Sequence, residues 1–402
     1  MKILQVCNKL PFPANDGSSI AITSLTEGFI KHNAEVHMLS MVNNSNNKLS
    51  NLPAWAIESL KLKTVNCNTR SNPFKAAYNL FFSKKPYEIE RFYSESFNKV
   101  LIDLLKHERF DIIQLEGLAL ASYIDDIKHH SDALIAMRAH NVEHEIRSRG
   151  LNYQVNIFIY TYLKLMVSRL RKFETEMLSK FDLLVPITYR DLLKFNEMGN
   201  IHPSIAIPFA MNPERAKVND NYVEFPSIFF LGALDWTPNQ GGLIWFINNV
   251  WDRLSEKYPN LKFYIAGRNS PSWLRKYFLA KNIVFLGEVP NAYDFMATKA
   301  IMVVPLFYGS GMRVKIIEAM AMGKAIISTE LGAEGINISN GKNLLIANDP
   351  DAFINQIDNM INNPQLYRNV CQSATEFIKE NFNNTTIAKH LVDFYNVQLS
   401  TR

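Results

Sequence analysis

The sequence has few cysteines and no pattern that would crosslink the chain. Only three occur in 402 residues, Cys7, Cys67 and Cys371, and they are far apart and odd in number. Disulfide scaffolds and zinc ribbons need paired or closely spaced cysteines. We therefore expect a protein of a reducing compartment, with no metal site built from these residues.

Long hydrophobic runs are also missing. The apolar run at the start of the chain, residues 1–7, is too short for a signal peptide. The most apolar long stretch, residues 155–167, contains Asn156, Thr161 and Lys164 and falls short of the roughly 20 residues that a membrane span needs. The expected location is cytoplasmic, with at most peripheral contact with the inner face of a membrane.

A strong net charge is absent. The 43 Lys and Arg residues exceed the 38 Asp and Glu residues by only five, so we expect no nucleic-acid partner. Positive charge is concentrated in one segment, residues 61–100, where eight basic residues alternate with aromatic ones and only three acidic residues occur. This segment could contact anionic lipid or hold a lipid-linked acceptor. The alternative is an exposed helical face over a packed aromatic cluster.

What the sequence does contain is short apolar runs that alternate with longer amphipathic segments. This alternation predicts βαβ units and parallel sheets with helices on both faces, and uninterrupted Val, Ile, Leu and Phe runs are typical of strands buried on both faces. The predicted strands are residues 3–7, 36–41, 112–115, 133–137, 183–187, 228–231, 263–266, 283–286, 301–305 and 325–328.

The chain is long enough for two domains, because single cores stop growing at roughly 250–300 residues. The alternation pauses over residues 205–226, where three prolines follow Pro203, and then resumes. We predict two doubly wound Rossmann-like α/β domains, residues 1–207 and 208–383, and a final amphipathic helix at 384–402. In open parallel sheets ligands bind beyond the carboxyl ends of the strands. The residues just after each strand are therefore the candidates for chemistry.

The turn after the strand that ends at Pro305 is the most informative. Gly309 and Gly311 flank a small residue, and a helix is predicted over residues 312–323. Backbone N–H groups at a glycine-rich turn before a helix form an anion site, and phosphate is its usual ligand.

The charged residues of that helix support the anion site. Arg313 and Lys315 lie in the first turn, where the helix dipole favours acidic residues, so a bound phosphate or diphosphate would offset them. Glu318 lies among apolar residues and needs a partner, either Lys315 or the hydroxyls of a ribose. The alternative is a packed helix with a solvated basic first turn.

This segment resembles the carboxyl-terminal signature of the family-four retaining glycosyltransferases, also called group 1 glycosyltransferases, which have the GT-B fold. The resemblance rests on Pro305-Leu306, Gly309-Ser310-Gly311 and Glu318-Ala-Met-Ala-Met-Gly323, and extends from residue 228 to about residue 382. It implies two Rossmann-like domains that face each other across a cleft, with the last helix crossing back to the amino-terminal domain. It also implies transfer of a sugar, with retention, from a UDP- or GDP-sugar to an acceptor hydroxyl, without a metal or other cofactor.

The resemblance implies roles for the matching residues. Arg313 and Lys315 would neutralise the diphosphate during catalysis. The other donor-site residues would be Gly267, Arg268, Glu288 and Val289 at the base, Glu318 at the ribose, Gly309, Ser310 and Gly311 at the diphosphate and sugar, and Glu334 at the cleft.

The sequence departs from the family pattern in two places. Ser310 occupies the position of the first glutamate of the Glu-x7-Glu motif, in a Gly-Ser-Gly-x-Arg-x-Lys variant that identifies a branch of the family. Residues 232–240 replace the usual Gly-Arg and Lys-Gly pairs, so Arg313 and Lys315 are the candidate diphosphate cations.

The amino-terminal half matches more loosely. Gly17 and Ser18 follow the first strand, where the family has a glycine-rich loop near the donor phosphates; a plain capped turn is the alternative. His140 follows a strand and resembles the family's catalytic cleft histidine, although a lone histidine is more often structural. Asn141 and Glu116 are candidate acceptor contacts, and Glu116 could equally be a solvated loop carboxylate.

The expected function is glycosyl transfer to a glycan or lipid-linked glycan, in the assembly of cell-surface polysaccharide or lipopolysaccharide. Two alternatives are open. One is a nucleotide-sugar 2-epimerase of the same fold, which needs no acceptor. The other is a sugar-nucleotide-binding protein without catalytic activity, for which Ser310 in place of glutamate is the main argument.

Overall fold

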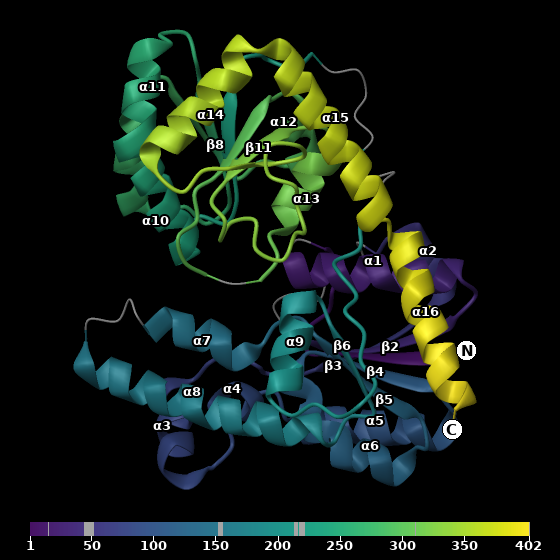
Figure 1. The fold of residues 1–402 in the computed structure, drawn as a ribbon. Helices are drawn as coiled ribbons and strands as arrows, with labels where there is room; N and C mark the ends of the chain where they lie inside the picture. The colour runs from purple at the N-terminus through teal and green to yellow at the C-terminus, as the bar shows by residue number, and fades with distance from the viewer. Residues whose placement is uncertain are drawn as a thin grey trace. The chain divides into compact units, whose positions relative to one another are not determined.

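The computed structural model describes residues 1–14, 16–43, 52–151, 156–212, 216, 222–309 and 311–401. The chain divides into two compact units, each with a six-stranded sheet of its own (Figure 1). Unit 1 comprises Met1–Met211 and Asn384–Arg402, and unit 2 comprises Asn212–Asn383. The units divide four residues after the boundary expected at residue 207.

The sheet of unit 1 is parallel throughout, in the order β3-β2-β1-β4-β5-β6. The carboxyl ends of all its strands therefore lie along one edge. The register pairs Cys7 with Glu116, and Glu116 with Arg138, so three central strands end side by side. The strands are β1 (Lys2–Cys7), β2 (Glu35–Val42), β3 (Leu60–Asn66), β4 (Ile112–Glu116), β5 (Leu134–Ala139) and β6 (Leu183–Pro186).

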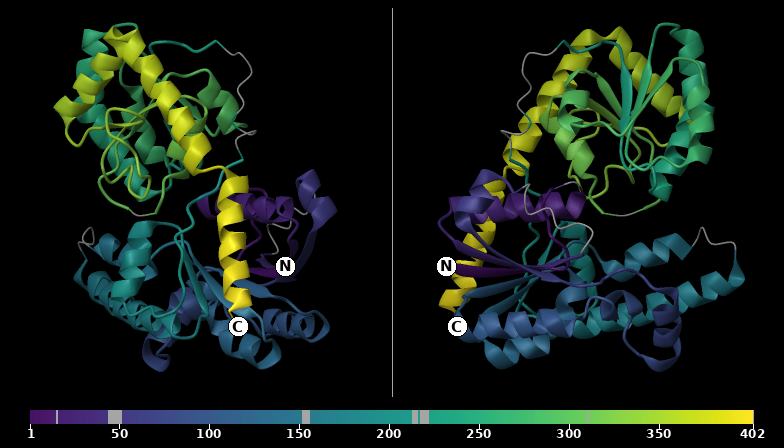
Figure 2. Two further views of the ribbon diagram at one scale, coloured as in Figure 1. Left: turned by 45° about the vertical axis from the view of Figure 1, so that its right-hand side comes forward. Right: turned by 180° about the vertical axis from the view of Figure 1, so that it is seen from behind.

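Helices cover both faces of this sheet (Figure 2). Side chains of α1 (Gly17–Lys31) and α16 (Asn384–Ser400) form one core with the strands, so the last helix returns to unit 1 as predicted. Side chains of α5 (Glu95–His107), α6 (Ile124–His130) and α8 (Ile157–Leu178) form the core on the other face. The remaining helices are α2 (Ala54–Ser59), α3 (Pro73–Phe82), α4 (Tyr87–Glu90), η3 (Leu118–Tyr123), α7 (Glu143–Leu151) and α9 (Tyr189–Glu197).

The sheet of unit 2 has the same doubly wound plan, in the order β12-β11-β10-β7-β8-β9 with parallel strands. Its strands are β7 (Ile228–Leu231), β8 (Phe263–Ala266), β9 (Ile283–Gly287), β10 (Ile301–Val304), β11 (Ala325–Ser328) and β12 (Leu345–Ile346). Its helical segments are α10 (Thr237–Phe246), η5 (Ile247–Trp251), α11 (Asp252–Lys257), η6 (Ser272–Leu279), α12 (Ala292–Ala297), α13 (Val314–Ala321), α14 (Pro350–Asn362) and α15 (Pro364–Asn381).

Alternation along β7 assigns the helices of unit 2 to faces of the sheet. Phe230 belongs to the core formed with α10, α11 and α14. Its neighbour Phe229 points to the opposite face, where its ring meets that of Phe295 on α12 edge-on, with centroids 5.7 Å apart.

The predicted α/β class and all ten predicted strands are confirmed, and two strands were not predicted. The edge strand β3 carries Lys61 and Lys63 between apolar residues, so it lacks the continuous apolar run used to find the others. The other, β12, has only two residues. None of the helices in the described ranges is long and apolar enough to cross a membrane.

Candidate functional site

Two glycines shape the turn after β10. Gly309 has φ of 108° and Gly311 has φ of 82°, conformations that favour glycine. A Cβ added to Gly309 would lie 3.1 Å from the ring of Trp236. The turn therefore needs glycine both for its backbone and for its close approach to the tryptophan. Ser310, a predicted donor contact, lies outside the described residues.

An aromatic side chain that the sequence reading missed supports this turn. The guanidinium carbon of Arg313 lies 5.4 Å from the ring centroid of Trp236, a cation–π distance, and its Nη1 donates to the carbonyl of Gly311. Tyr308 donates to the carbonyl of Thr237 at 2.7 Å and so ties the turn to the start of α10. Trp236 lies in the 232–240 segment, and the departure of that segment from the family pattern was the one sign in the sequence that its residues act differently here.

The helix that follows presents a buried carboxylate. Helix α13 begins at Val314 rather than near residue 312. Glu318 is 2% exposed; its Oε1 accepts a hydrogen bond from the hydroxyl of Tyr293 at 2.8 Å. Its Oε2 lies 2.8 Å from Nζ of Lys315, yet it has no well-aligned hydrogen bond. Of the two partners expected for Glu318 from sequence, the structure pairs it with Lys315, and contact with a ribose hydroxyl stays a prediction.

Tyr293 was not predicted from the sequence. It lies in the first turn of α12, directly after the 288–291 turn, and its bond to Glu318 links that turn to α13. Glu334, predicted at the cleft, is half-buried in the turn after β11. Strands β10 and β11 are neighbours in the sheet, so the glycine turn after β10 and the turn after β11 begin at adjacent strand ends.

A pocket of about 390 Å³ lies at the carboxyl ends of β8 and β9 in unit 2. Two predicted donor residues, Gly267 and Glu288, line it together, whereas Arg268 and Val289 are not among the lining residues. The pocket also contains Arg275 and Phe285, which the sequence reading missed, with the guanidinium carbon 6.0 Å from the ring centroid. An aromatic face and a cation suit a planar, polar ligand such as a nucleobase.

In unit 1, the structure brings two predicted residues together. Nε2 of His140, just after β5, lies 2.9 Å from Oε2 of Glu116 at the end of β4. His140 keeps 12% of its side chain exposed, whereas Glu116 keeps 1%. The geometry therefore favours a positioning role for Glu116, which orients the imidazole, over the acceptor contact expected from sequence. Asn141 is half-buried beside His140.

A buried polar network fixes this carboxylate. Its Oε1 accepts hydrogen bonds from the amides of Gln5, at 3.2 Å, and Gln114, at 2.5 Å. Tyr395 of α16 donates to Oε1 of Gln114 at 2.8 Å, which orients the Gln114 amide so that it donates to Glu116. Thr26 of α1 does the same for Gln5 at 2.7 Å. Helix α16 thus supports His140 indirectly: its Tyr395 orients Gln114, and Gln114 in turn holds Glu116.

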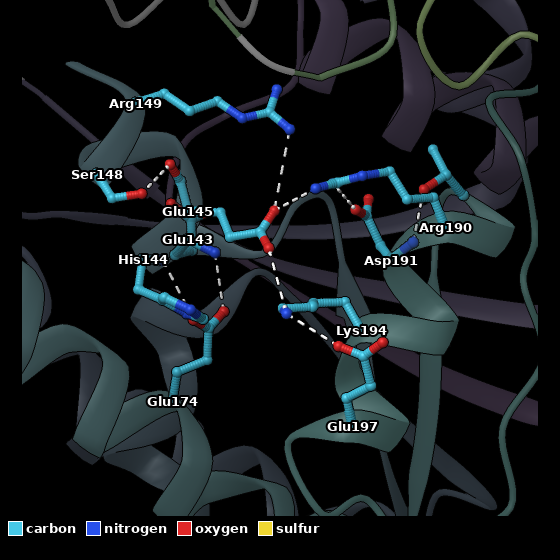
Figure 3. Close-up of polar contacts among 11 residues, drawn as sticks. Glu143, His144, Glu145, Ser148, Arg149, Glu174, Arg190, Asp191, Lys194 and Glu197 are labelled. Atoms are coloured by element: carbon cyan, nitrogen blue, oxygen red, sulfur yellow. Dashed lines mark hydrogen bonds and ion pairs between the residues drawn. The ribbon is translucent and has the colours of Figure 1, made fainter. Parts of the chain in front are cut away.

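The helix after His140 is anchored as well (Figure 3). The carboxylate of Glu174, from α8, accepts from the backbone N–H groups of Glu143 and His144 at 2.9 and 3.2 Å, and lies 2.6 Å from Nδ1 of His144. It satisfies N–H groups that a helix start leaves unpaired. Burial and the neighbouring Glu174 carboxylate raise the pKa of Glu143 to about 7. A carboxyl that titrates near neutral pH therefore lies three residues after His140.

The first turn of α7 is also tied to α9. Figure 3 shows Glu145 between cations: it pairs with Arg190 and lies 3.8 Å from Nζ of Lys194. Thr188 caps α9 by accepting from the N–H of Asp191 at 3.0 Å. The segment after His140 is therefore held by α8 on one side and α9 on the other.

The loop after β1 places Gly17 and Ser18 at the start of α1. Asp16 caps the helix and accepts from Ser18 Oγ at 2.9 Å, from the N–H of Ser19 at 3.1 Å and from Nζ of Lys9 at 2.7 Å. Burial acts to raise the pKa of Asp16, but the Lys9 charge and these hydrogen bonds outweigh it and hold the pKa at about 2. The capped turn expected as the alternative is present.

A polar cavity of about 460 Å³ adjoins this turn in unit 1. Its lining includes Lys9, Asp16 and Ser19 together with Phe12 and Thr69. Neither Gly17 nor Ser18 lines it. No group of three or more His, Cys, Asp or Glu residues that could hold a metal ion occurs in the described part of the chain.

Comparison with known proteins gives these sites a context. Residues 225–363 match the family model described as glycosyl transferases group 1, and this range contains every donor residue predicted in unit 2. The whole chain is 25% identical, over 96% of its length and 97% of the other, to an uncharacterised 44.6 kDa protein in the cps region of Klebsiella pneumoniae.

Solved structures share the fold over the whole chain. Sucrose-phosphate synthase from Thermosynechococcus elongatus superposes with a TM-score of 0.72 at 14% identity, covering 100% of both chains. Anabaena HepE in complex with UDP gives 0.69 at 13% identity and also covers 100% of both. A TarM variant from S. aureus, in complex with fondaparinux, α-GlcNAc-glycerol and UDP, gives 0.71 at 13% identity and covers 98% of this chain and 99% of that one.

Residues 225–363 of unit 2 therefore match the group 1 glycosyltransferases, and the chain has the GT-B fold. The resemblance to the group 1 glycosyltransferases and their fold is confirmed, whereas retention and the Gly-Ser-Gly-x-Arg-x-Lys branch stay predictions. The roles of individual residues stay predictions.

Proposed function

We propose that this chain, which matches the group 1 glycosyltransferases over residues 225–363 and has the GT-B fold, transfers a sugar from a nucleotide-diphosphate donor to a glycan hydroxyl, with retention at the anomeric carbon. The observation that carries the proposal is the 305–318 segment. It combines a glycine turn, two cations and a buried carboxylate within the range that matches the family. The UDP bound by HepE and TarM supports a nucleoside-diphosphate donor.

Unit 2 would bind the donor. Glu318 has a buried oxygen that lacks a well-aligned hydrogen bond, and the hydroxyls of a ribose would supply two donors for that carboxylate. The 390 Å³ pocket with Phe285 and Arg275 would take the base. Lys315, 36% exposed, can reach from Glu318 to an adjacent phosphate without losing contact with solvent.

The chemistry would rest on stabilising the leaving diphosphate. The bond between the anomeric carbon and the diphosphate oxygen breaks, and the acceptor oxygen forms the new bond on the same face of the sugar. The acceptor proton passes to a phosphate oxygen. Negative charge grows on the diphosphate meanwhile, and Arg313, Lys315 and the N–H groups at the start of α13 would stabilise it.

In unit 1, we propose that His140 contacts a substrate hydroxyl and that Glu116 positions the His140 ring. A neutral imidazole that donates from Nε2 to Glu116 keeps Nδ1 as an acceptor for such a hydroxyl. Glu174 anchors the start of α7, three residues after His140, through Glu143 and His144. The relative in the K. pneumoniae cps region supports a role in surface polysaccharide assembly. We expect the reaction to occur in the cytoplasm.

A panel of donors tests the proposal. Thermal unfolding of the full chain is measured with UDP-, GDP- and ADP-sugars, and the donor that raises the melting temperature is then incubated with and without glycan acceptors. We expect acceptor-dependent release of the nucleoside diphosphate and a product with the donor's anomeric configuration. Conversion of the donor without acceptor would indicate an epimerase, and binding without turnover an inactive protein. Either result would contradict the proposal.

A further inference from the structure

Helix α3 turns an aromatic face to solvent. Phe74, Tyr78, Phe81 and Phe82 are 87%, 64%, 76% and 74% exposed. Tyr78, Phe81 and Phe82 follow Phe74 by four, seven and eight residues, a spacing that places side chains on one side of a helix. The packed aromatic cluster expected as the alternative for this segment is thus absent from α3, although the rings of Tyr78 and Phe82 stack on each other at 4.8 Å.

Polar contacts, not these aromatics, hold α3 to unit 1. Asn79 is 2% exposed, and its Nδ2 donates to the carbonyl of Lys85 at 3.0 Å and to the carboxylate of Glu90 at 2.5 Å. Arg169 of α8 donates to the carbonyls of Asn79 and Leu80, at 3.3 and 2.9 Å, and so caps the end of α3. An amphipathic helix of a globular protein normally buries its apolar side. In α3 Asn79 is the one buried residue, Ala76 and Leu80 are half-buried, and the aromatic side is left exposed to another surface.

Lysines lie within α3 and directly after it. Lys75, Lys84 and Lys85 are exposed, and no ion pair includes any of them in the ranges that the structure describes. The carboxylates nearest in sequence are engaged elsewhere: Glu90 accepts from Asn79, and Glu88 lies 3.5 Å from Arg147. The face is therefore both apolar and positively charged.

Neighbouring helix α8 adds exposed apolar groups. Leu165, one turn before Arg169, is 43% exposed, and Phe158 in the first turn is 84% exposed. Both figures show α3 beside α8 within unit 1, with α3 at the outside of the unit (Figures 1 and 2).

We propose that the α3 surface, defined as Phe74, Tyr78, Phe81 and Phe82 with Lys75, Lys84 and Lys85, docks on a bilayer that contains anionic phospholipid. Aromatic rings insert at the level of the headgroups, and lysine stems lie along the apolar zone while their ammonium groups meet lipid phosphates. Protein interfaces, in contrast, are depleted in lysine. The charge on the rim therefore favours lipid over a protein partner.

The proposal goes beyond the glycosyl transfer proposed above and is tested without donor or acceptor. The full chain is sedimented with vesicles of phosphatidylcholine alone and of phosphatidylcholine with about 30% phosphatidylglycerol, a charge density like that of anionic leaflets. We expect binding to the anionic vesicles only, and weaker binding as salt is raised, because exposed charges are screened.

Two variants locate the surface. The changes Phe74→Ser, Phe81→Ser and Phe82→Ser together, and Lys75→Glu, Lys84→Glu and Lys85→Glu together, are each expected to lower vesicle partitioning by about tenfold or more. Matched controls in unit 2 are Leu279→Ser, at a site 85% exposed, and the combined changes Lys281→Glu, Lys342→Glu and Lys379→Glu. The controls should bind like the native chain, and melting temperatures report whether each variant folds.

Three results would overturn the proposal: no binding to anionic vesicles, binding that both variants retain, or equal binding to neutral vesicles. Self-association that the aromatic variant abolishes would also overturn it, because the surface would then join two copies of the chain. Transfer to a water-soluble acceptor should be unchanged in both variants. Loss of vesicle binding with intact transfer separates this proposal from the proposed function.

Discussion

The candidate residues of the two units are held in place in different ways. In unit 2, the glycine turn, Arg313, Lys315 and Glu318 lie within ten residues of one another, on one turn and the helix after it. In unit 1, His140 depends on Glu116, 24 residues away, and on Gln114, whose partner Tyr395 is 281 residues away. The comparison suggests that unit 2 provides a local anion site, whereas unit 1 provides a rigid support assembled from distant parts of the chain.

The largest effect is expected in the local site of unit 2. Arg313→Ala should lower kcat for transfer by about 10²–10³-fold, because it removes a cation placed to stabilise charge that develops in the transition state. Steady-state kinetics measure this, with Arg368→Ala, an exposed arginine of α15, as the matched control. Native kcat in a folded Arg313→Ala variant would refute the role given to this turn.

The support in unit 1 should give an effect of about tenfold. Glu116→Gln keeps the shape of the side chain but lets the amide donate, so the Nε2–H of His140 loses its carboxylate acceptor. We expect kcat to fall with little change in the KM for donor, and the His140 ring to lose its single tautomer, as observed by ¹⁵N NMR. If Glu116 only stabilised the fold, the His140 tautomer would be the same in the folded Glu116→Gln variant as in the native chain.

A smaller effect should follow from changing the support of Glu318. Tyr293→Phe removes one hydrogen bond to the carboxylate, and since such a bond is worth roughly 1 kcal/mol, donor affinity should weaken by about fivefold with kcat nearly unchanged. Isothermal titration calorimetry with the donor measures this, and Tyr277→Phe in η6 is the control. If both variants bind donor equally well, Tyr293 does not orient Glu318.

The smallest effect concerns the cap of α1 in unit 1. Asp16 has a pKa of about 2 in the folded protein, below its ordinary value, so its stabilising contribution is complete above that ordinary value and is lost as pH falls through about 2. Because the side chain is 39% exposed, we expect only about 1 kcal/mol. Urea unfolding at several pH values should show Asp16→Asn destabilised near neutral pH, with the difference vanishing in acid. A constant difference would exclude the ionised cap as the cause.

The sequence predicted the fold well because buried parallel strands are continuous apolar runs. It failed at β3, where alternating lysines mark an edge strand, and at the two-residue β12. In unit 2 the sequence could bring the glycine turn and Glu318 together in one candidate site, since they are neighbours along the chain. It missed the contacts of Trp236 with Arg313 and of Tyr293 with Glu318, because each pair joins two separate elements; for Trp236 the one signal was the departure of residues 232–240 from the family pattern.

The buried setting of Glu116 could not be predicted for a similar reason. Its position after a strand was visible, but the sequence left a solvated loop carboxylate open as an alternative. Only the pairing of β1, β4 and β5 and the return of α16 show that Gln5, Gln114 and His140 enclose it.

The central claim, that the turn after β10 binds a diphosphate, is tested most directly by comparing a nucleoside diphosphate with its monophosphate by calorimetry. The account predicts that the native chain binds the diphosphate at least about tenfold more tightly, because the second phosphate meets Arg313, Lys315 and the start of α13. It predicts that this preference nearly disappears when Arg313 and Lys315 are both changed to alanine. A preference that survives the double change, or that the native chain lacks, would contradict the account.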